Sequence, residues 1–121
     1  MSQKNVDQPI VHKIRRPKIV HGETTKIETS CGHLYVTVNS VNDMPIEVFL
    51  TMGKTDGCAL CQNSALGITI SEALQHGVDI EVFGRSLRGI TCPKPMFLPG
   101  GKKFLSCPDA ISNLLSEYVK E

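Results

Sequence analysis

The five cysteines are the residues of this chain best suited to chemistry. Cys58 and Cys61 form a C-x2-C pair, a spacing at which both sulfur atoms reach one ion from the start of a helix. Cys92 and Cys107 are each followed by proline, and Cys31 falls in a predicted turn. Thiolates are soft ligands that select zinc, and a closed set of four is structural. The spacing therefore predicts a zinc site built from four of the five cysteines.

Two other uses of these cysteines remain open at the level of sequence. Free cysteines in a core act as small hydrophobic side chains and need no ligand. A thiol redox couple of Cys58 and Cys61 is the second alternative, because a helix N-terminus stabilises a thiolate. His33, two residues after Cys31, is a further candidate metal donor. The chain shows no Ser-His-Asp order and no phosphate-binding glycine loop, so we expect no catalytic residues.

The composition is that of an ordinary globular chain. Of its 121 residues 40% are hydrophobic and 21% are charged, and the formal net charge is +1, which gives no global sign of a nucleic-acid or membrane partner. A chain of this length buries roughly two thirds of its unfolded surface in one domain. It has no apolar run of membrane-spanning length, and its first residues lack a signal-peptide core. We expect a cytoplasmic protein whose cysteines serve metal or redox chemistry.

The first 21 residues form a basic segment without hydrophobic periodicity, which predicts an extended arm before a domain at residues 22–121. Four of its cations lie close together around Pro17: Lys13, Arg15, Arg16 and Lys18. A solvated tail is one interpretation of this arm. The alternative is contact with the phosphates of a nucleotide or nucleic acid, although the aromatic residues typical of single-strand binding are missing.

Hydrophobic residues alternate with polar ones in three segments, which predicts strands over 26–29, 34–38 and 46–52. A turn at residues 31–33 and a loop at 39–45 connect them, and such short connections indicate an antiparallel meander. Its third strand has Val48 and Leu50 on the buried side. Glu47 and Phe49 are expected on the outer side, with Glu47 solvated.

After the third strand, the apolar residues recur with the spacing of a helix. Apolar spacing predicts a long helix over 58–77 that buries residues 59, 60, 65, 66, 70, 73 and 74, and a shorter one over 78–90 capped by Asp79. Three prolines and a glycine pair exclude regular structure over 91–101. A third helix follows, with Ser106 or Cys107 as its cap, Pro108 in its first turn and Asp109 beside its positive end. The expected fold is α+β, a three-stranded antiparallel sheet packed by about three helices.

Five segments of the chain resemble the TSCPD domain, a family found at the C-terminus of adenosylcobalamin-dependent ribonucleotide reductases and also as small free-standing proteins. The resemblance covers residues 22–121. Leu105 stands where the name motif of the family has threonine, but Cys107, Pro108 and Asp109 are in place. The segments are TSCGHLYVTV at 29–38, IEVFL at 46–50, GCA at 57–59, GITCP at 89–93 and LSCPDAI at 105–111.

The resemblance implies that Cys31, Cys58, Cys92 and Cys107 are the recurring cysteines, with Cys61 as an extra. It also implies a small zinc-binding accessory or regulatory module of a ribonucleotide reductase, docked on the catalytic subunit and not catalytic alone. Adenosylcobalamin would then be bound only by the partner reductase. The redox alternative becomes a shuttle that re-reduces such a reductase through Cys58 and Cys61.

Overall fold

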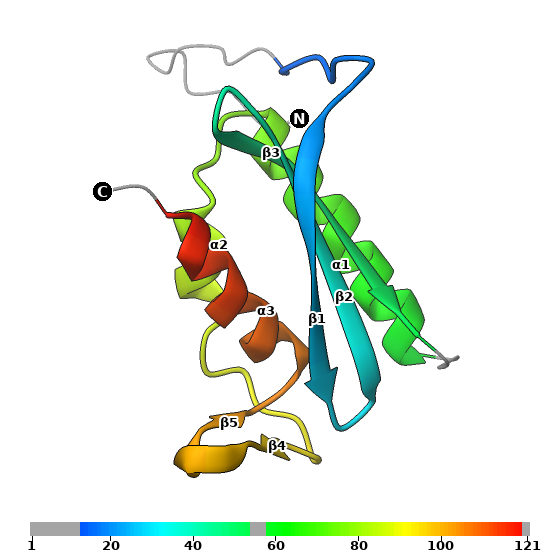
Figure 1. Ribbon diagram of the computed structural model, residues 1–121, viewed down its shortest axis with the longest axis vertical. Helices are drawn as coiled ribbons and strands as arrows, with labels where there is room; N and C mark the ends of the chain where they lie inside the picture. Colours follow the sequence, from blue (N-terminus) through cyan, green and yellow to red (C-terminus); the bar gives the residue numbers. More distant parts are fainter. Residues whose placement is uncertain (1–12, 54–57, 120–121) are drawn as a thin grey trace, which may run out of the picture.

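A three-stranded antiparallel sheet runs the length of the molecule (Figure 1). The computed structural model describes residues 13–53 and 58–119. In the sheet β2 (Gly32–Val41) lies between β1 (His21–Thr29) and β3 (Met44–Met52). The strands are longer than predicted, and most of the expected loop at 39–45 is strand. Asn42 and Asp43 both have positive φ, of 52° and 65°, so two residues suffice to turn the hairpin between β2 and β3.

Three α-helices accompany this sheet: α1 (Cys58–Gln75), α2 (Glu81–Ser86) and α3 (Cys107–Leu115). The predicted α+β class, three-stranded sheet and three helices are thus confirmed. The expectation of no regular structure over 91–101 is wrong in part. There β4 (Met96–Phe97) pairs with β5 (Lys103–Phe104), and a short 3-10 helix, η1 (Pro99–Gly101), connects them. A second 3-10 helix, η2 (Ser116–Tyr118), follows α3.

The core lies between one face of the sheet and the helices. The alternation of the strands turns Leu34, Val36 and Val48 inward, where each is fully buried. Ile111 and Leu115 of α3 pack in the same cluster, as the helical spacing of this segment predicts. Full burial of a side chain of this size contributes about 1.5–3 kcal/mol. This cluster fixes α3 against the sheet.

Helix α1 runs along β3, which is the outer strand on that side of the sheet (Figure 1). The backbone of Val48 is held by Ser71, whose hydroxyl accepts the Val48 N–H at 2.8 Å and donates to its carbonyl at 3.0 Å. Gln75 Nε2 donates to the Ile46 carbonyl at 3.2 Å. A Cβ on Gly67 would lie 3.2 Å from the Val48 carbonyl oxygen. The helix thus covers a strand edge that would otherwise expose unpaired backbone groups.

The face that α1 buries agrees with the predicted one at Ile70 and Leu74 and differs from it elsewhere. Its fully buried residues are Asn63, Gly67, Ile70 and Leu74, whereas Ala65, expected inside, is exposed. Polar or small residues recur at every fourth position from Asn63 to Gln75. This face of the helix lies against the edge of β3, where apolar side chains would leave backbone N–H and carbonyl groups unpaired.

Helices α2 and α3 pack closely at Gly84. A side chain there would lie 2.8 Å from the Ser116 hydroxyl, and the Ser112 hydroxyl donates to the Gly84 carbonyl at 2.8 Å. The glycine that weakens α2 as an isolated helix is therefore required by its packing. Asp79 accepts the Glu81 N–H at 2.9 Å, so its carboxylate serves the first turn of α2, although Ile80 is the N-cap residue.

Glu47 is buried, so the prediction that it is solvated is wrong. Only 3% of its surface is exposed, and its carboxylate accepts Arg16 Nε at 2.9 Å and Asn39 Nδ2 at 2.7 Å. Lys13 also pairs with Glu72 at 3.2 Å, and the Ile14 N–H donates to the Gln75 carbonyl. The described part of the arm is thus bound to β3 and α1, while the division of the chain at residue 21 stays a prediction. In the part of the chain that the structure describes, no helix has the length and apolarity to cross a membrane.

Candidate functional site

The N-terminus of α3 places Cys107 at the first helical position. Ser106 is the N-cap, as one of the two predicted alternatives has it, and its hydroxyl accepts the Asp109 N–H at 3.1 Å. The same hydroxyl donates to the Ile90 carbonyl. Pro108 occupies the first turn, where its missing N–H costs nothing. The cap therefore fixes Cys107 and also binds the preceding loop to the helix.

Asp109 joins three segments at this helix start. It is 5% exposed, and its two carboxylate oxygens accept the Gly89 N–H at 2.8 Å and the Leu105 N–H at 2.9 Å. The Leu105 carbonyl in turn accepts the Cys92 N–H at 3.0 Å. The negative charge also lies in the first turn of α3, where the helix dipole favours it. One buried carboxylate thus holds the loop of Cys92 against the helix of Cys107.

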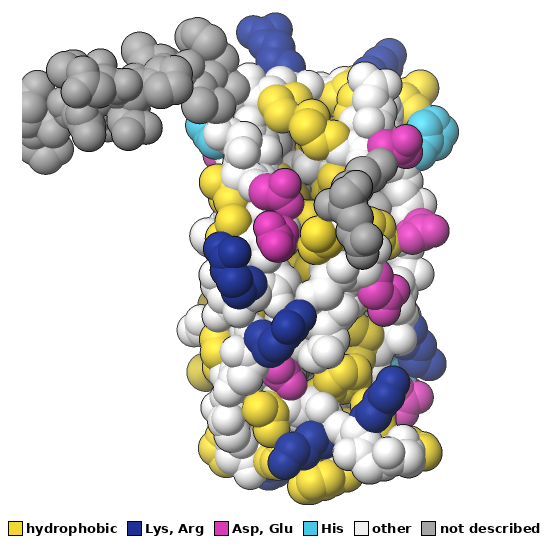
Figure 2. Space-filling model, turned by 90° about the vertical axis from the view of Figure 1, so that its left-hand side faces the viewer, with side chains coloured by type: hydrophobic (Ala, Val, Ile, Leu, Met, Phe, Trp, Pro, Cys, Tyr) yellow, Lys and Arg dark blue, Asp and Glu magenta, His cyan; other side chains and the backbone are white. Residues whose placement is uncertain are grey.

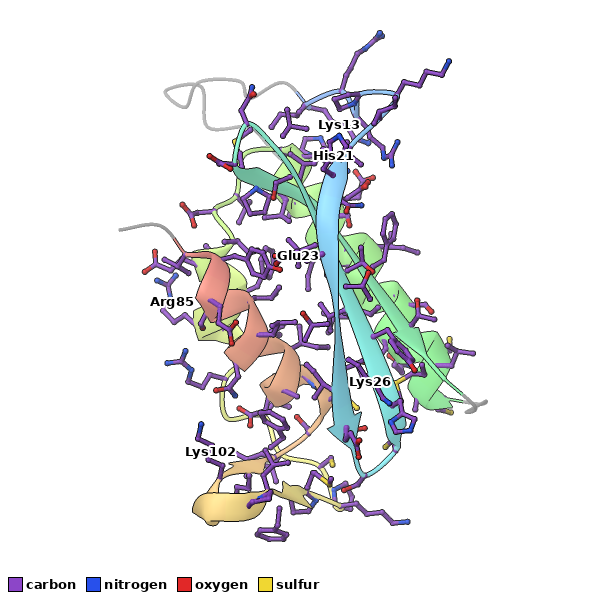
Figure 3. All side chains as sticks on the ribbon, viewed as in Figure 1. Lys13, His21, Glu23, Lys26, Arg85 and Lys102 are labelled. Carbon is purple, nitrogen blue, oxygen red and sulfur yellow. The ribbon has the colours of Figure 1, made fainter. Side chains whose placement is uncertain are left out.

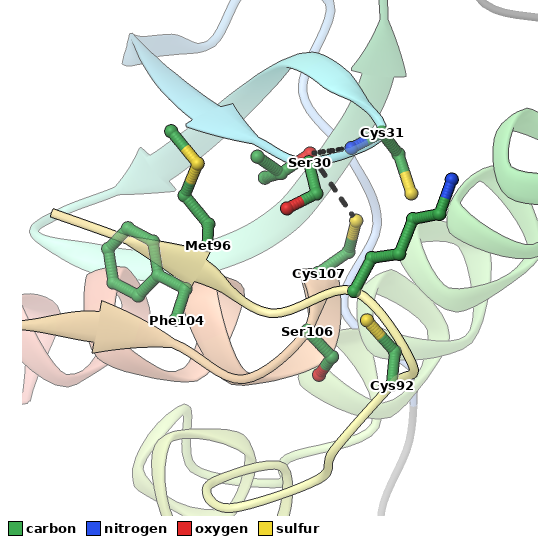
Figure 4. Close-up of a pocket in the computed structure, with 9 residues that line it drawn as sticks. Ser30, Cys31, Cys92, Met96, Phe104, Ser106 and Cys107 are labelled. Carbon is green, nitrogen blue, oxygen red and sulfur yellow. Dashed lines mark hydrogen bonds between the residues drawn. The ribbon is translucent and has the colours of Figure 1, made fainter.

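Thr29 links the turn between β1 and β2 to the same helix start (Figure 4). Its hydroxyl accepts the Cys31 N–H at 3.2 Å and the Cys107 thiol at 3.8 Å, and it donates to the Gly32 carbonyl at 2.9 Å. Ser30 in this turn donates to the Pro95 carbonyl at 3.2 Å. These bonds bring Cys31 to the start of α3.

Three thiols, Cys31, Cys92 and Cys107, consequently line one small pocket with Lys94 among its other walls. All three are free; Cys31 is exposed, and the other two are half-buried. Burial raises the pKa of Cys31, and the charge of Cys107, a hydrogen bond to it and the charge of Cys92 act in the same direction. The Lys94 ammonium partly opposes them. The pKa of Cys31 thus responds directly to Cys107.

Cys58 and Cys61 do not line this pocket. Both are exposed on the first turns of α1. The part of α1 that lines the neighbouring groove, next to Cys31, Cys92 and Cys107, is formed by Ala59, Gln62, Asn63 and Leu66. Those residues follow helical spacing along one face. Cys61 lies away from this face, and Cys58 lies at its edge, one turn before Gln62.

Four of the five motif segments lie wholly within the described residues, and Gly57 of the segment at 57–59 lies outside them. A family model of the TSCPD domain matches residues 7–119. The chain belongs to the TSCPD domain family. This family is associated with ribonucleotide reductases. No curated protein and no solved structure matches the chain with significance.

The TSCPD motifs at residues 29–38, 89–93 and 105–111 all meet at the pocket, although they are far apart in the sequence. Of the four cysteines that the TSCPD resemblance selects, the structure brings together Cys31, Cys92 and Cys107. Cys58 stays on α1.

The prediction of a zinc cofactor is wrong. Within residues 13–53 and 58–119, no three His, Cys, Asp or Glu side chains are grouped so that they could hold a metal ion. The physical reason is the orientation of α1, which turns Cys58 and Cys61 away from the other thiols. His33 is not part of any such metal-binding group within the described residues either. Its buried Nδ1 has no hydrogen-bond partner in the described structure. The alternative of buried hydrophobic cysteines agrees in part with Cys107, which is half-buried and packs against the core. It does not describe Cys31, Cys58 and Cys61, which are exposed.

Sequence reasoning missed two residues that build this site. Thr29 was not singled out, and Asp109 was expected only to favour the helix dipole, not to bind two distant N–H groups. The available signal was the position of Thr29 two residues before a cysteine and of Asp109 two residues after one. Short polar side chains at such positions accept backbone N–H groups locally.

The basic arm presents fewer free cations than the sequence indicated. Lys13 and Arg16 form ion pairs with Glu72 and Glu47. Figure 3 places Lys13 at the end of the molecule opposite Lys102, which lies beside the pocket end. Contact of the arm with a nucleotide or nucleic acid stays a prediction.

Proposed function

We propose that this chain is an accessory or regulatory module that docks on the catalytic subunit of an adenosylcobalamin-dependent ribonucleotide reductase and is not catalytic alone. The main observation behind the proposal is that three of the five TSCPD motif segments, 29–38, 89–93 and 105–111, meet at one end of the molecule. We call this surface the thiol end: Cys31, residues 89–97 and residues 102–109. The association of the family with ribonucleotide reductases supports the choice of partner.

The thiol end has the chemistry of a docking surface. Phe97 is 71% exposed and Ile90 44% exposed, and large apolar side chains of this kind on a surface are typical of binding sites. The Lys103 ammonium lies 5.9 Å from the centre of the Phe97 ring. Figure 2 shows hydrophobic and basic side chains side by side at this end of the molecule.

The positive charge of the thiol end indicates which kind of partner surface would bind it. Lys94, Lys102 and Lys103 are all exposed at the thiol end. A carboxylate-bearing segment of the reductase would pair with these ammonium groups while its apolar residues cover Phe97. Attraction between opposite charges would speed the encounter and would weaken as salt screens it.

Binding of the full chain to the purified catalytic subunit tests the proposal, with the affinity measured by calorimetry. Phe97→Ser should weaken binding at least about tenfold, since truncating a central aromatic anchor costs about 2 kcal/mol or more and tenfold corresponds to about 1.4 kcal/mol. Ile68→Ser is the matched control, because Ile68 is 67% exposed on α1 and outside the thiol end. Binding should also fall with increasing salt.

A rate measurement separates regulation from docking. Deoxyribonucleotide formation by the catalytic subunit should change when the chain is added, and the Phe97→Ser variant should require a higher concentration for the same change. Failure of the unmodified chain to bind, or an equal loss of affinity in Phe97→Ser and Ile68→Ser, would contradict the proposal.

A further inference from the structure

Two of the three thiols at the pocket, Cys31 and Cys107, line it together, and the Thr29 hydroxyl bonds to the Cys31 N–H and to the Cys107 thiol. Close thiols are the starting geometry of a disulfide. Cys92 lies near enough to act on Cys31 through its charge. This pair differs from Cys58 and Cys61, the couple that the C-x2-C spacing suggests, and only the fold brings it together.

Rigid elements hold both members of the pair. Cys31 belongs to the two-residue turn between β1 and β2, and the Cys31 N–H is bound to Thr29. Cys107 begins a nine-residue helix with a capped N-terminus, and its thiol donates to the same Thr29 hydroxyl at 3.8 Å. Thr29 is therefore a positioning residue for both sulfur atoms. Such fixed placement raises the effective concentration of one thiol at the other.

The pair is open to a large reagent. Cys31 is exposed, and Cys31 and Cys107 also line a groove beside the pocket. The walls of this groove include the apolar side chains of Leu66, Leu87 and Ile90. An extended peptide would bury apolar side chains along such walls, whereas the polar glutathione molecule gains little from them.

We propose that Cys31 and Cys107 form a dithiol and disulfide couple that exchanges with a disulfide carried by a polypeptide. One thiolate of the pair attacks a sulfur of the incoming disulfide, which forms a mixed disulfide and releases the first thiol of the substrate. The second thiolate then attacks the mixed disulfide, so the Cys31–Cys107 bond forms and the second substrate thiol leaves. The two protons lost by the pair appear on the two product thiols. The incoming disulfide is the oxidant.

To test the proposal, the full chain is equilibrated in mixtures of reduced and oxidised glutathione. The thiols are then trapped by acid and alkylation, and the disulfides are mapped by mass spectrometry. A peptide linked through Cys31 and Cys107 is the expected product. Cys31→Ser and Cys107→Ser should each abolish it, while Cys61→Ser and Cys92→Ser should retain it. Thr29→Val should lower the equilibrium constant for its formation several-fold, with circular dichroism used to confirm that the fold persists.

Disulfide mapping of the unmodified chain tests the Cys31–Cys107 couple even if one of the variants fails to fold. Mixed disulfides with glutathione alone, or a predominant link between Cys58 and Cys61 or through Cys92, would overturn the couple.

A second comparison concerns the substrate. A cyclic peptide disulfide should exchange faster than oxidised glutathione at equal concentration, and equal or slower exchange would overturn the assignment to a polypeptide disulfide. No reductase is needed, so this result is independent of docking.

Discussion

The α1 side of the molecule and the thiol end are held together in different ways. Along α1, a regular helix lies on a regular strand, and polar side chains such as Ser71 pair with the backbone of Val48. At the thiol end the backbone is a turn, a loop and a helix start, joined by the side chains of Thr29 and Asp109. The first arrangement spreads its stabilising contacts along the helix, whereas the second depends on a few residues.

This difference indicates where function can reside. No residue from 91 to 97 in the loop of Cys92 is fully buried, so the thiols there remain reachable, and a few polar side chains, among them Asp109 and Thr29, keep the site assembled. A loop that carries reactive groups needs such polar anchors because it has no periodic apolar face to bury. The predictions below compare the two regions, beginning with the anchor that we expect to matter most.

Asp109→Ala should destabilise the protein by about 3 kcal/mol, because the Gly89 and Leu105 N–H groups lose a charged acceptor in a buried place. Chemical denaturation measures the change. Asp79→Ala is the control, since Asp79 also accepts an N–H at a helix start but is exposed, and it should cost about 1 kcal/mol or less. Equal losses in the two variants would remove the special role of Asp109.

Ser71→Ala should cost about 1–2 kcal/mol, because the Val48 N–H at the edge of the sheet is left without an acceptor. The better helix propensity of alanine offsets part of this loss. Thr69→Ala, in the same helix, removes an exposed hydroxyl that bonds only to the Ala65 carbonyl, and it should change stability by less than about 0.5 kcal/mol. Thermal unfolding of both variants is the measurement. A smaller loss of stability in Ser71→Ala than in Thr69→Ala would show that the hydrogen bonds of Ser71 to the edge of β3 do not stabilise the fold.

Tyr118→Phe should cost about 0.5–1 kcal/mol at neutral pH, because the phenol donates to Glu23 at 2.7 Å in an exposed place. Burial, this bond and the charges of Glu23 and Glu117 raise the pKa of Tyr118 to about 12 from 10.0. Since the folded state holds the proton more tightly, this stabilisation is complete below pH 10 and is lost as the pH rises towards about 12.

The pH dependence gives the check on Tyr118. Unfolding free energies measured over that alkaline range should fall less steeply for Tyr118→Phe than for the unmodified chain. Parallel curves would mean that the phenol loses its proton equally in the folded and unfolded chains.

Cys107→Ser should speed the alkylation of Cys31 several-fold near neutral pH with little change in stability. Burial and, after it, the charge of Cys107 and the hydrogen bond to it raise the pKa of Cys31, so removing that thiol allows more thiolate to form. Rates measured by mass spectrometry with iodoacetamide test this, with Cys61→Ser as the control. The same rate in both variants would show that Cys31 and Cys107 do not interact.

Local features of the fold were predictable because they depend on neighbouring residues. The cap at Ser106, the proline after Cys107 and the alternation of Leu34 and Val36 act within a few positions, and all were found where the sequence placed them. The burial of Glu47 was not predictable, because its partner Arg16 comes from another segment. The buried face of α1 was predicted in part, at Ile70 and Leu74. Asn63 and Gly67 were missed because apolar spacing alone does not show that a helix lies on a strand edge.

The sequence by itself determined the strands, the helices, the capped cysteine at α3 and membership of the TSCPD family. Only the tertiary structure decided which thiols meet. Cys58 and Cys61 are neighbours in sequence, yet the rotation of α1 directs them away from the pocket, whereas Cys31 and Cys107 meet through Thr29. Periodicity and capping act over a few residues, but the distance between remote side chains depends on how whole elements pack.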